Sequence, residues 1–250
     1  MSTSPRTRIL VVSRAGAVER RREFAAAACE ATLDWAFLEA FETLHPALTY
    51  NEDDAIVAKG RRLQPGELGC YSSHYEAWSR LVADEKADQY IVLEDDVIAD
   101  WRCLAGLAAI DHTTRGNHYI RLYYKKPAPS RIIEKDYGAR GRWLTEVTGY
   151  CFGTQGYLIT KPAAAIFIAR LARVIRPIDD AMDRSWVHGV PNLAIFPFPL
   201  IERSMESGIG LSRFETQEVP ARLKIKRAIA RQRERLGYHL LGRGRALLGR

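Results

Sequence analysis

The feature that most constrains this chain is a short apolar run, Gln89 to Leu93, that passes directly into three consecutive carboxylates, Glu94, Asp95 and Asp96. Such a continuous run predicts a buried strand, and acids at its carboxyl end lie where ligands bind in open α/β sheets. Adjacent acids repel one another unless a cation lies among them, so the triplet predicts a divalent ion, Mg2+ or Mn2+, held by oxygen ligands. A solvated acidic turn or a helix N-cap is the alternative interpretation.

Strand and helix patterns alternate along the rest of the chain. We expect strands at 8–13, 118–123, 150–160 and 193–200, and helices at 18–29, 67–83 and 163–174, with a polar, irregular segment at 42–64. This alternation favours an α/β fold with a mostly parallel sheet flanked by helices. With 250 residues, 47% of them hydrophobic, the chain can form one substantial core with an appendage.

The four cysteines are far apart and form no paired metal motif, which indicates reduced thiols and a cytoplasmic protein. The apolar run that follows the N-terminus, Ile9 to Val12, is too short for a secretory signal. The longest apolar stretch, Ala163 to Ile175, contains two arginines and falls short of a membrane-spanning helix. We therefore expect no segment that crosses a membrane.

Positive charge is concentrated at the C-terminal end. Residues 221–250 hold ten Lys and Arg against one Glu, whereas residues 1–220 hold 27 basic and 29 acidic side chains. This contrast predicts a main domain, 1–220, and a basic amphipathic helical tail, 221–250, with Ile225, Ile229, Leu236 and Leu240 on one helical face. Such a helix suits an anionic membrane surface, and docking on the domain or partial disorder are the alternatives.

A longer block around the acidic triplet is recognisable. Residues 63–97, with P-G-E-L-G-C-Y-S-S-H-x-x-A-W followed by Y-I-V-L-E-D-D-V, closely resemble glycosyltransferase family 25, which includes lipooligosaccharide and collagen galactosyltransferases. The resemblance extends to V-V-S-R-A-G-A-V-E-R-R, G-T-Q-G-Y-L-I-T and P-I-D-D in the same order. The pair Ser13-Arg14 departs from the Asn-Leu or Ser-Leu that relatives often carry.

This resemblance implies a GT-A type, Rossmann-like fold. It also implies the transfer of a sugar, with galactose as the expected one, from a UDP-sugar with inversion of the anomeric carbon. It also implies a metal, Mn2+ or Mg2+, held by Glu94 and Asp96 in the role of a D-x-D motif. The implied acceptor is a lipopolysaccharide, a lipooligosaccharide or a related lipid-linked oligosaccharide. Membrane docking through the tail would place the enzyme peripherally on the inner face of the cytoplasmic membrane.

An inverting transfer needs a general base near the acceptor hydroxyl. The acidic turn supplies Asp179, our first choice by its match to the family, with Asp180 and Asp183 as further candidates. A helix cap formed by Asp179 or Asp180 is the competing interpretation.

Basic side chains after the first strand, and side chains of the block 63–97, are candidates for contacts with the donor. Arg14, Arg20 and Arg21 follow the first strand and could meet a diphosphate or a uracil edge, or remain solvated helix arginines. Glu67 and His74 lie seven residues apart on one predicted helix. Both are candidates for binding the donor, as are Glu94 and Asp95 of the acidic triplet. His74 could contact the donor, orient an acid or be satisfied by a backbone carbonyl.

Other segments have less specific interpretations. Gly153 and Gly156 allow close backbone approach, either to the sugar or to a neighbouring strand. Cys70 and Trp78 are assigned to packing, and the loop 125–142 is our candidate for acceptor contacts.

Three other function classes explain less of the sequence. Nucleic-acid binding does not explain the acidic triplet, and the main domain lacks the net positive charge that such binding requires. A catalytically degenerate, membrane-tethered scaffold would not need the intact triplet. A hydrolase with paired carboxylates does not call for three acids in a row.

Overall fold

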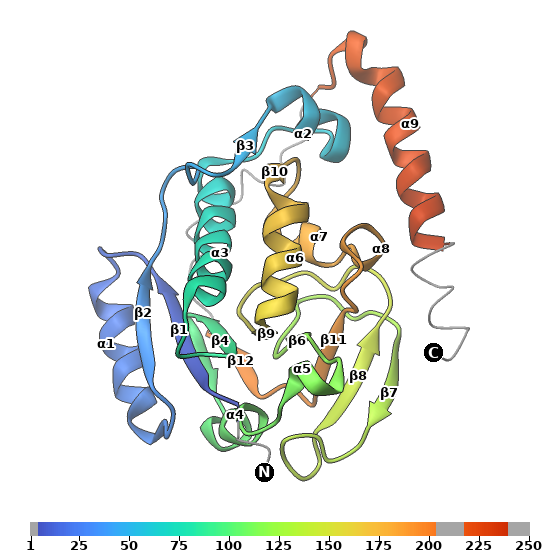
Figure 1. Cartoon of the computed structure of the whole chain (residues 1–250). Coiled ribbons are helices and arrows are strands. Elements are labelled where there is room, and N and C mark those ends of the chain that lie inside the picture. The colour runs from blue at the N-terminus through green and yellow to red at the C-terminus, as the bar shows by residue number, and fades with distance from the viewer. Residues whose placement is uncertain (1–4, 204–217, 240–250) are drawn as a thin grey trace.

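The computed structural model describes residues 5–203 and 218–239 of the chain, which form a mixed eight-stranded sheet with helices on both faces (Figure 1). The strand order is β2-β1-β4-β9-β6-β11-β8-β7. The short pairs β10-β3 and β12-β5 lie outside it. The strands are β1 (Thr7–Ser13), β2 (Trp35–Glu39), β3 (Thr49–Tyr50), β4 (Gln89–Glu94), β5 (Val97–Ala99), β6 (Tyr119–Arg121), β7 (Ser130–Glu134), β8 (Trp143–Val147), β9 (Gly156–Thr160), β10 (Arg173–Val174), β11 (Leu193–Phe196) and β12 (Leu200–Glu202).

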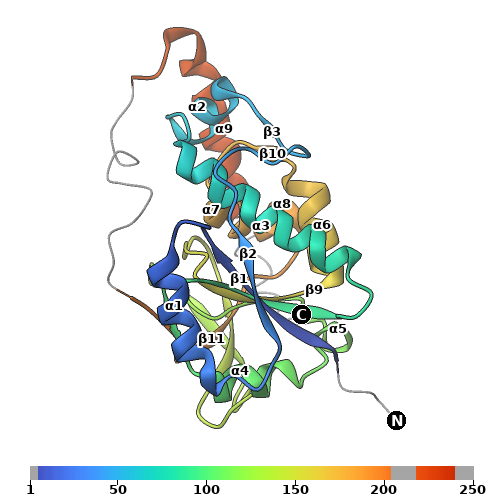
Figure 2. The ribbon, with the colours of Figure 1, turned by 90° about the vertical axis from the view of Figure 1, so that its left-hand side faces the viewer.

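Two groups of helices cover the two faces of the sheet (Figure 2). The helices are α1 (Val18–Ala27), η1 (Ala28–Glu30), α2 (Glu52–Lys59), α3 (Pro65–Ala83), α4 (Trp101–Ala108), α5 (His112–Arg115), α6 (Lys161–Leu171), α7 (Ile178–Met182), α8 (Ser185–His188) and α9 (Ala221–Gly237). Helices α1 and α4 lie on one face, and α3 and α6 lie on the other.

Side-chain alternation along the central strands produces these two core layers. Leu10 and Val12 of β1 join the cluster that contains Trp78 of α3. Ile9 and Val11 of the same strand join the cluster that contains Phe24 of α1. A strand with apolar side chains on both sides has to be covered on both faces, as the continuous apolar runs predicted.

The expectation of a mostly parallel sheet is confirmed for the direction of most strands, but the sheet also contains antiparallel strands. Six strands of the main sheet run in one direction, and β9 and β8 run in the other. Strand β9 lies antiparallel between β4 and β6. The residues of β9 were predicted as a strand, but apolar alternation reads the same in both directions and does not reveal its orientation.

The prediction of an irregular segment at 42–64 was wrong, because this segment contains β3 and α2. Asn51 accepts a hydrogen bond from Asp54 N at 3.2 Å, and Gly60 closes the helix with φ +86°. An N-cap, three acids in the first turn and a C-terminal glycine are recognisable helix signals.

Helix α9 is docked on the domain through one side. Leu223 is buried, and Arg227 donates to the carbonyl of Ile56 in α2 at 3.2 Å. Arg222 pairs with Asp53 at 2.9 Å, and Glu234 accepts from Arg184 Nε at 2.8 Å. Of the alternatives for the tail, docking on the domain therefore describes residues 221–237.

The outer side of α9 keeps the predicted apolar face. Ile225, Ile229 and Leu236 are 75%, 50% and 58% exposed. Leu240, the fourth residue assigned to that face, lies outside the described residues. No helix within 5–203 or 218–239 combines the length and apolarity that crossing a membrane requires.

A fully buried ion pair joins the sheet to α7. Arg121 of β6 donates to Asp183 Oδ1 at 2.7 Å, and both side chains are at most 1% exposed. Arg121 also donates to Gly153 O at 2.5 Å and to Asn192 Oδ1 at 3.0 Å. The charge of Asp183 outweighs the opposing effect of burial and raises the pKa of Arg121.

We expect Arg121→Met to lower the free energy of unfolding by about 3–5 kcal/mol, because it leaves Asp183 buried and unpaired. Urea denaturation measures the change. Arg115→Met is the matched control, because Arg115 and Glu134 form an exposed pair and such pairs are worth at most about 1 kcal/mol. Equal effects of the two substitutions would contradict the assigned role of the buried pair.

Candidate active site

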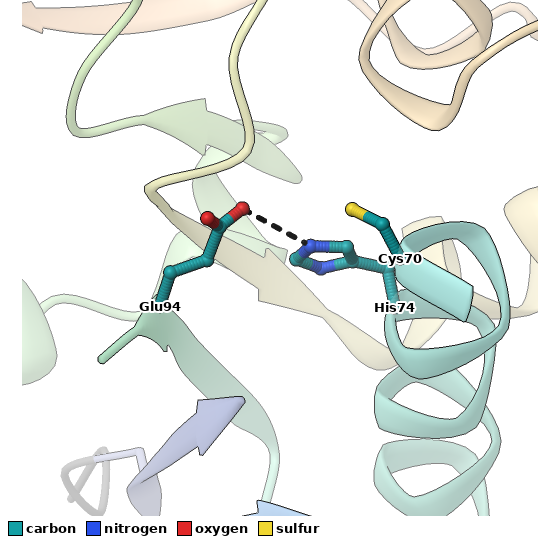
Figure 3. Close-up of side chains that lie close together, drawn as sticks. All are labelled: Cys70, His74 and Glu94. Carbon is teal, nitrogen blue, oxygen red and sulfur yellow. Dashed lines mark ion pairs between the residues drawn. The ribbon is translucent and has the colours of Figure 1, made fainter. Parts of the chain in front are cut away.

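The three carboxylates at the end of β4 have three different environments. Glu94 faces α3, where its Oε1 lies 3.6 Å from His74 Nε2 (Figure 3). Asp95 is buried and faces the end of β1. Asp96 follows in the turn before β5 and has a buried Oδ1 without a hydrogen-bond partner. The triplet is therefore not a uniformly solvated turn.

Glu94 ends a chain of buried polar groups that starts in α3. Trp78 Nε1 donates to the hydroxyl of Tyr157 at 2.9 Å, and that hydroxyl lies 3.0 Å from His74 Nδ1. A tyrosine hydroxyl that accepts from Trp78 is free to donate to His74 Nδ1, which leaves the proton of a neutral imidazole on Nε2. His74 Nε2 then faces Glu94 at 3.6 Å, beyond hydrogen-bond distance, and has no hydrogen-bond partner within the described residues.

Glu94 also accepts a hydrogen bond from the hydroxyl of Thr154. Burial by itself raises the pKa of Glu94, but the approach of His74 and the Thr154 hydroxyl outweigh it and hold the pKa below its ordinary value. Glu94 is therefore a carboxylate at neutral pH.

Asp95 joins the triplet to the first strand and helix. Ser13 Oγ donates to Asp95 Oδ2 at 2.6 Å, and Arg20 Nη1 lies 3.3 Å from Asp95 Oδ1. Arg21 donates to both the hydroxyl and the carbonyl of Ser13. Arg14 is exposed on the loop that follows β1. The sheet thus places Arg20 beside the triplet, whereas Arg21 reaches it through Ser13.

Asp96 is the least compensated of the three acids. Burial, followed by the charges of Glu94, Asp95 and Glu202, raises the pKa of Asp96 to about 7. The sequence offered no signal for Glu202, which β12 brings here through its antiparallel pairing with β5. Glu202 is itself paired with Lys125 at 2.7 Å.

The segment 151–155 lies between the triplet and the acidic turn. Phe152 and Gly153 have φ of +55° and +93°, which is left-handed backbone that strains Phe152 and suits glycine. Asp183 holds this backbone by accepting from Cys151 N at 3.0 Å and Phe152 N at 2.8 Å. The same segment carries Thr154 to Glu94. Gly156 instead lies in β9, where a side chain would collide with Leu93 and Leu200, so its role is packing.

Asp179 and Asp180 have different partners. Asp179 accepts from Gly153 N at 3.2 Å and Asp180 N at 2.8 Å, and burial raises the pKa of Asp179 despite these hydrogen bonds. Asp180 is buried and pairs with Lys59 Nζ at 2.5 Å and Arg176 Nη1 at 3.1 Å. Asp179 is thus held by backbone N–H groups, whereas Asp180 is engaged by two basic side chains.

Glu67 lies at the N-terminus of α3 in a closed set of contacts. Arg61 binds it in bidentate fashion at 2.7 and 2.6 Å, and Gln64 N donates to it at 2.8 Å as part of a capping box. Gly69, two residues further along α3, lies against the backbone of Phe41, where an added Cβ would be 2.4 Å from the carbonyl oxygen. These contacts fix the position of the N-terminal part of α3, and with it the polar side chains that this helix carries.

One cluster within the described residues has the composition of a metal site. Potential ligand atoms of Cys70, His74 and Glu94 all lie within 4.8 Å of one another (Figure 3). Cys70 and His74 are one helical turn apart, a spacing that was available in the sequence although Cys70 was assigned to packing. Burial raises the pKa of the Cys70 thiol well above its ordinary value, which disfavours the thiolate that a soft metal binds.

Comparison with known proteins identifies the family that this chain resembles in sequence. A family model described as "Glycosyltransferase family 25 (LPS biosynthesis protein)" matches residues 6–182. A "Glycosyltransferase 25 family member" from Aedes aegypti is 27% identical over 148 residues, which cover 53% of this chain and 23% of that protein. A protein of the same description from Drosophila pseudoobscura pseudoobscura is 26% identical over 127 residues, covering 48% and 19% respectively.

The chain thus spans less than a quarter of the length of these curated relatives. Among solved structures, "Crystal Structure of A197 from STIV" superposes with a TM-score of 0.39 and 13% identity, covering 78% of this chain and 83% of that one.

We expect Asp96→Asn to change how stability depends on pH in the presence of EDTA. Folding raises the pKa of Asp96 from 3.8 to about 7, so between these values the folded chain holds a proton that the unfolded chain has lost. The contribution of this group to the free energy of unfolding therefore falls as pH rises through that window.

The variant should accordingly gain about 1 kcal/mol or more over the parent at pH 8 and much less at pH 4.5. Urea denaturation at both pH values measures this difference. Asp34→Asn, at an exposed carboxylate, is the control. A difference that does not depend on pH would contradict the raised pKa.

Proposed function

The chain belongs to glycosyltransferase family 25, and we propose that it transfers galactose from UDP-galactose to a hydroxyl of a lipopolysaccharide or lipooligosaccharide type of glycan, with inversion of the anomeric carbon. Family membership supports sugar transfer in general. The words "LPS biosynthesis protein" in the family description favour a bacterial surface glycan as the acceptor. The arrangement of the sheet, with acids at the carboxyl end of β4, is compatible with a GT-A type fold.

One observation carries the proposal: two sets of carboxylates meet the same short segment, 151–155. Thr154 donates to Glu94 of the triplet, and Gly153 N donates to Asp179 of the acidic turn. An inverting transferase needs charge stabilisation for the leaving diphosphate and a base for the acceptor hydroxyl, on opposite sides of one sugar. The segment joins groups that suit both tasks.

The triplet fits a hard divalent cation. Asp96 has an unpartnered buried oxygen, and repulsion from its acidic neighbours raises its pKa, so a cation would satisfy both. We assign Glu94 and Asp96 as the residues that hold Mn2+ or Mg2+. Such an ion neutralises charge that develops on a departing diphosphate.

For the general base we propose Asp179, with Asp180 as the less favoured candidate. Asp179 is held by two backbone N–H groups and faces no basic side chain in an ion pair within the described residues. Its raised pKa brings it closer to the value that suits proton transfer near neutral pH. Asp180 is engaged by Lys59 and Arg176, so we propose that it fixes the turn.

Donor contacts are proposed at the edge formed by β1 and β4. Arg20 lies beside Asp95, and Arg14 is exposed on the adjacent loop, where guanidinium groups suit a diphosphate. We propose that Glu67 and His74 act indirectly, because Arg61 binds Glu67 in bidentate fashion and His74 lies beside Glu94.

We also propose a peripheral location on an anionic membrane surface, the inner face of the cytoplasmic membrane. Ile225, Ile229 and Leu236 form an exposed apolar stripe on α9, and Lys224 and Arg235 lie beside it on the same helix. Exposed apolar residues flanked by cations are typical of helices that lie in the headgroup layer. An enzyme that acts on a lipid-linked oligosaccharide benefits from this position.

The first experiment is UDP release from UDP-galactose, UDP-glucose and UDP-N-acetylglucosamine by the purified protein with Mn2+, Mg2+ or EDTA. We expect one donor, UDP-galactose, to be cleaved slowly in a reaction that EDTA abolishes. Asp96→Asn should lower the rate about 100-fold or more, because the ion that stabilises the leaving group is lost.

Asp34→Asn serves again as the control and should match the parent. Metal-dependent UDP binding without turnover would favour a catalytically degenerate scaffold. UDP release that is insensitive to both EDTA and Asp96→Asn would refute the metal assignment, and steep salt-dependent binding to DNA or RNA in place of UDP binding would refute the enzyme.

With an acceptor present, Asp179→Asn should lower the rate of transfer by about 100- to 10,000-fold while leaving the affinity for UDP within a few-fold. Steady-state transfer rates and calorimetric titration with UDP and Mn2+ measure the two effects. Loss of UDP affinity in parallel with transfer would assign Asp179 to the donor side instead.

We expect Ile225→Asp with Leu236→Asp to reduce binding to phosphatidylglycerol vesicles about tenfold or more, because each change places a charge in the apolar stripe. Vesicle co-sedimentation measures this binding, with phosphatidylcholine vesicles as the neutral reference. Val82→Asp, at a 43% exposed apolar residue of α3, is the control. Unchanged binding in the double variant would rule out the stripe as the membrane contact.

A further inference from the structure

A cleft of about 840 Å³ lies between α9 and the domain, apart from the carboxylates of the proposed active site. Its walls come from α2, from the segment 173–176, from α8 and from α9. Figure 1 shows α9 alongside the α2 and α8 side of the molecule.

The lining of the cleft is strongly cationic. Seven basic side chains line it against two acidic ones, Asp54 and Glu234. Both acids are already engaged, because Asp54 pairs with Arg173 at 2.5 Å and Glu234 accepts from Arg184 Nε at 2.8 Å. The lining therefore carries an excess of positive charge that acids of the described chain do not neutralise.

The excess lies on α9. Lys226, Arg231, Arg233 and Arg235 line the cleft and form no ion pair within the described residues. Arg227, on the same helix, has its pKa lowered by burial and by repulsion from Arg231, as expected where like charges gather without counter-ions. A concave wall of unpaired guanidinium and ammonium groups attracts anions, and guanidinium groups suit phosphate oxygens in particular.

The cleft also has an apolar part that a simple ion would not need. Trp186 lines it half-buried, together with Ile175 and Ala230. An indole face beside several arginines suits a ligand with a flat apolar face and charged substituents. A pyranose ring that carries phosphate groups has both properties, and the volume of the cleft is large enough for more than one sugar unit.

The cleft continues toward the proposed active site. A second hollow of about 340 Å³ shares Glu234 and Arg235 with it and is lined by Lys126 and Tyr150. The ring of Tyr150 stacks on that of Phe152 with centroids 5.6 Å apart, and Phe152 belongs to the segment that joins Glu94 to Asp179. On the inner side, Arg176 lines the cleft and hydrogen-bonds Asp180, the neighbour of Asp179.

We propose that this cleft binds a phosphate-bearing saccharide and holds the acceptor of the reaction by its phosphorylated part. The assignment to the acceptor rests on the proposed transferase function, whereas anion binding by the cleft does not. Phosphate oxygens bind Lys226 and Arg233, and the sugar ring packs on Trp186. The phosphate headgroups of a lipid bilayer carry the same chemistry, so the test separates the two sources.

The test is calorimetric titration of the full chain with glucose 1,6-bisphosphate, inorganic pyrophosphate and glucose at low salt. We expect glucose 1,6-bisphosphate to bind more tightly than pyrophosphate and glucose not to bind. Lys226→Glu with Arg233→Glu should weaken the bisphosphate Kd at least about tenfold, because two charge-assisted contacts become repulsive.

The matched control is Lys86→Glu with Arg102→Glu, which changes the net charge equally at two exposed residues that do not line the cleft. It should change the Kd less than about threefold, the effect of net charge alone. Thermal melting verifies that both variants are folded.

Absence of bisphosphate binding, or equal weakening in the two double variants, would overturn the proposal. Binding to phosphatidylglycerol vesicles that the cleft variant loses, in a protein that does not bind the bisphosphate, would assign the cleft to lipid headgroups and also overturn it. UDP release by the parent protein reports separately on the proposed function, so bisphosphate binding without UDP release would refute the donor reaction and leave the cleft standing.

Discussion

The ion pair between Arg121 and Asp183 is the interaction on which the arrangement of the candidate site depends. Both groups are almost completely buried, and a buried charge is tolerated only when it is paired and its remaining hydrogen-bonding positions are filled. Arg121 reaches Gly153 and Asn192, and Asp183 receives the N–H groups of Cys151 and Phe152. These contacts hold a segment that includes left-handed backbone at Phe152, which has to be stabilised from outside. Thr154 and Gly153 then bring Glu94 and Asp179 to two ends of one short segment.

The three adjacent carboxylates of the acidic triplet lie in three different electrostatic environments. Asp95 is paired with Arg20 and hydrogen-bonded by Ser13, and Glu94 accepts a hydrogen bond from Thr154 and lies beside His74. Asp96 has a buried oxygen without a hydrogen-bond partner, and burial and the charges of its acidic neighbours outweigh Arg20 and raise its pKa to about 7. Residues that suit a cation and residues whose contacts stabilise the fold thus lie within the same three consecutive positions. Asp96 keeps a buried oxygen without a hydrogen-bond partner, which favours the carboxylates as ligands for the proposed metal.

Helix α9 combines three surfaces in one amphipathic segment. Its inner side, with Leu223, Arg227 and Glu234, docks on the domain. Its outer side exposes Ile225, Ile229 and Leu236, of which Ile229 also lines the cleft, and its flanks contribute the unpaired cations of the cleft. Glu234, the only acid among residues 221–250, forms the ion pairs that fix the helix beside α8. The proposed membrane contact and the proposed acceptor cleft would then lie on adjacent sides of the same helix, which suits an acceptor that extends from a lipid surface.

The sequence by itself determined the features that depend on neighbours along the chain. Apolar periodicity located β1, α1, α3, β4 and α6, and the block around Glu94 indicated the family. The same local signals were present for α2 in Asn51 and Gly60, where the prediction was nevertheless wrong. What only the tertiary structure decided is the direction of β9, the partners of each carboxylate and the place of α9. Arg121 and Asp183 are 62 positions apart, and His74 and Tyr157 are 83 apart, so their meeting follows from the order of strands in the sheet and not from local spacing. The pKa of Asp96 likewise depends on Glu202, whose position is set by the pairing of β12 with β5. Long-range pairing of this kind is the physical reason that a motif can name candidate residues in advance while the fold assigns their chemistry.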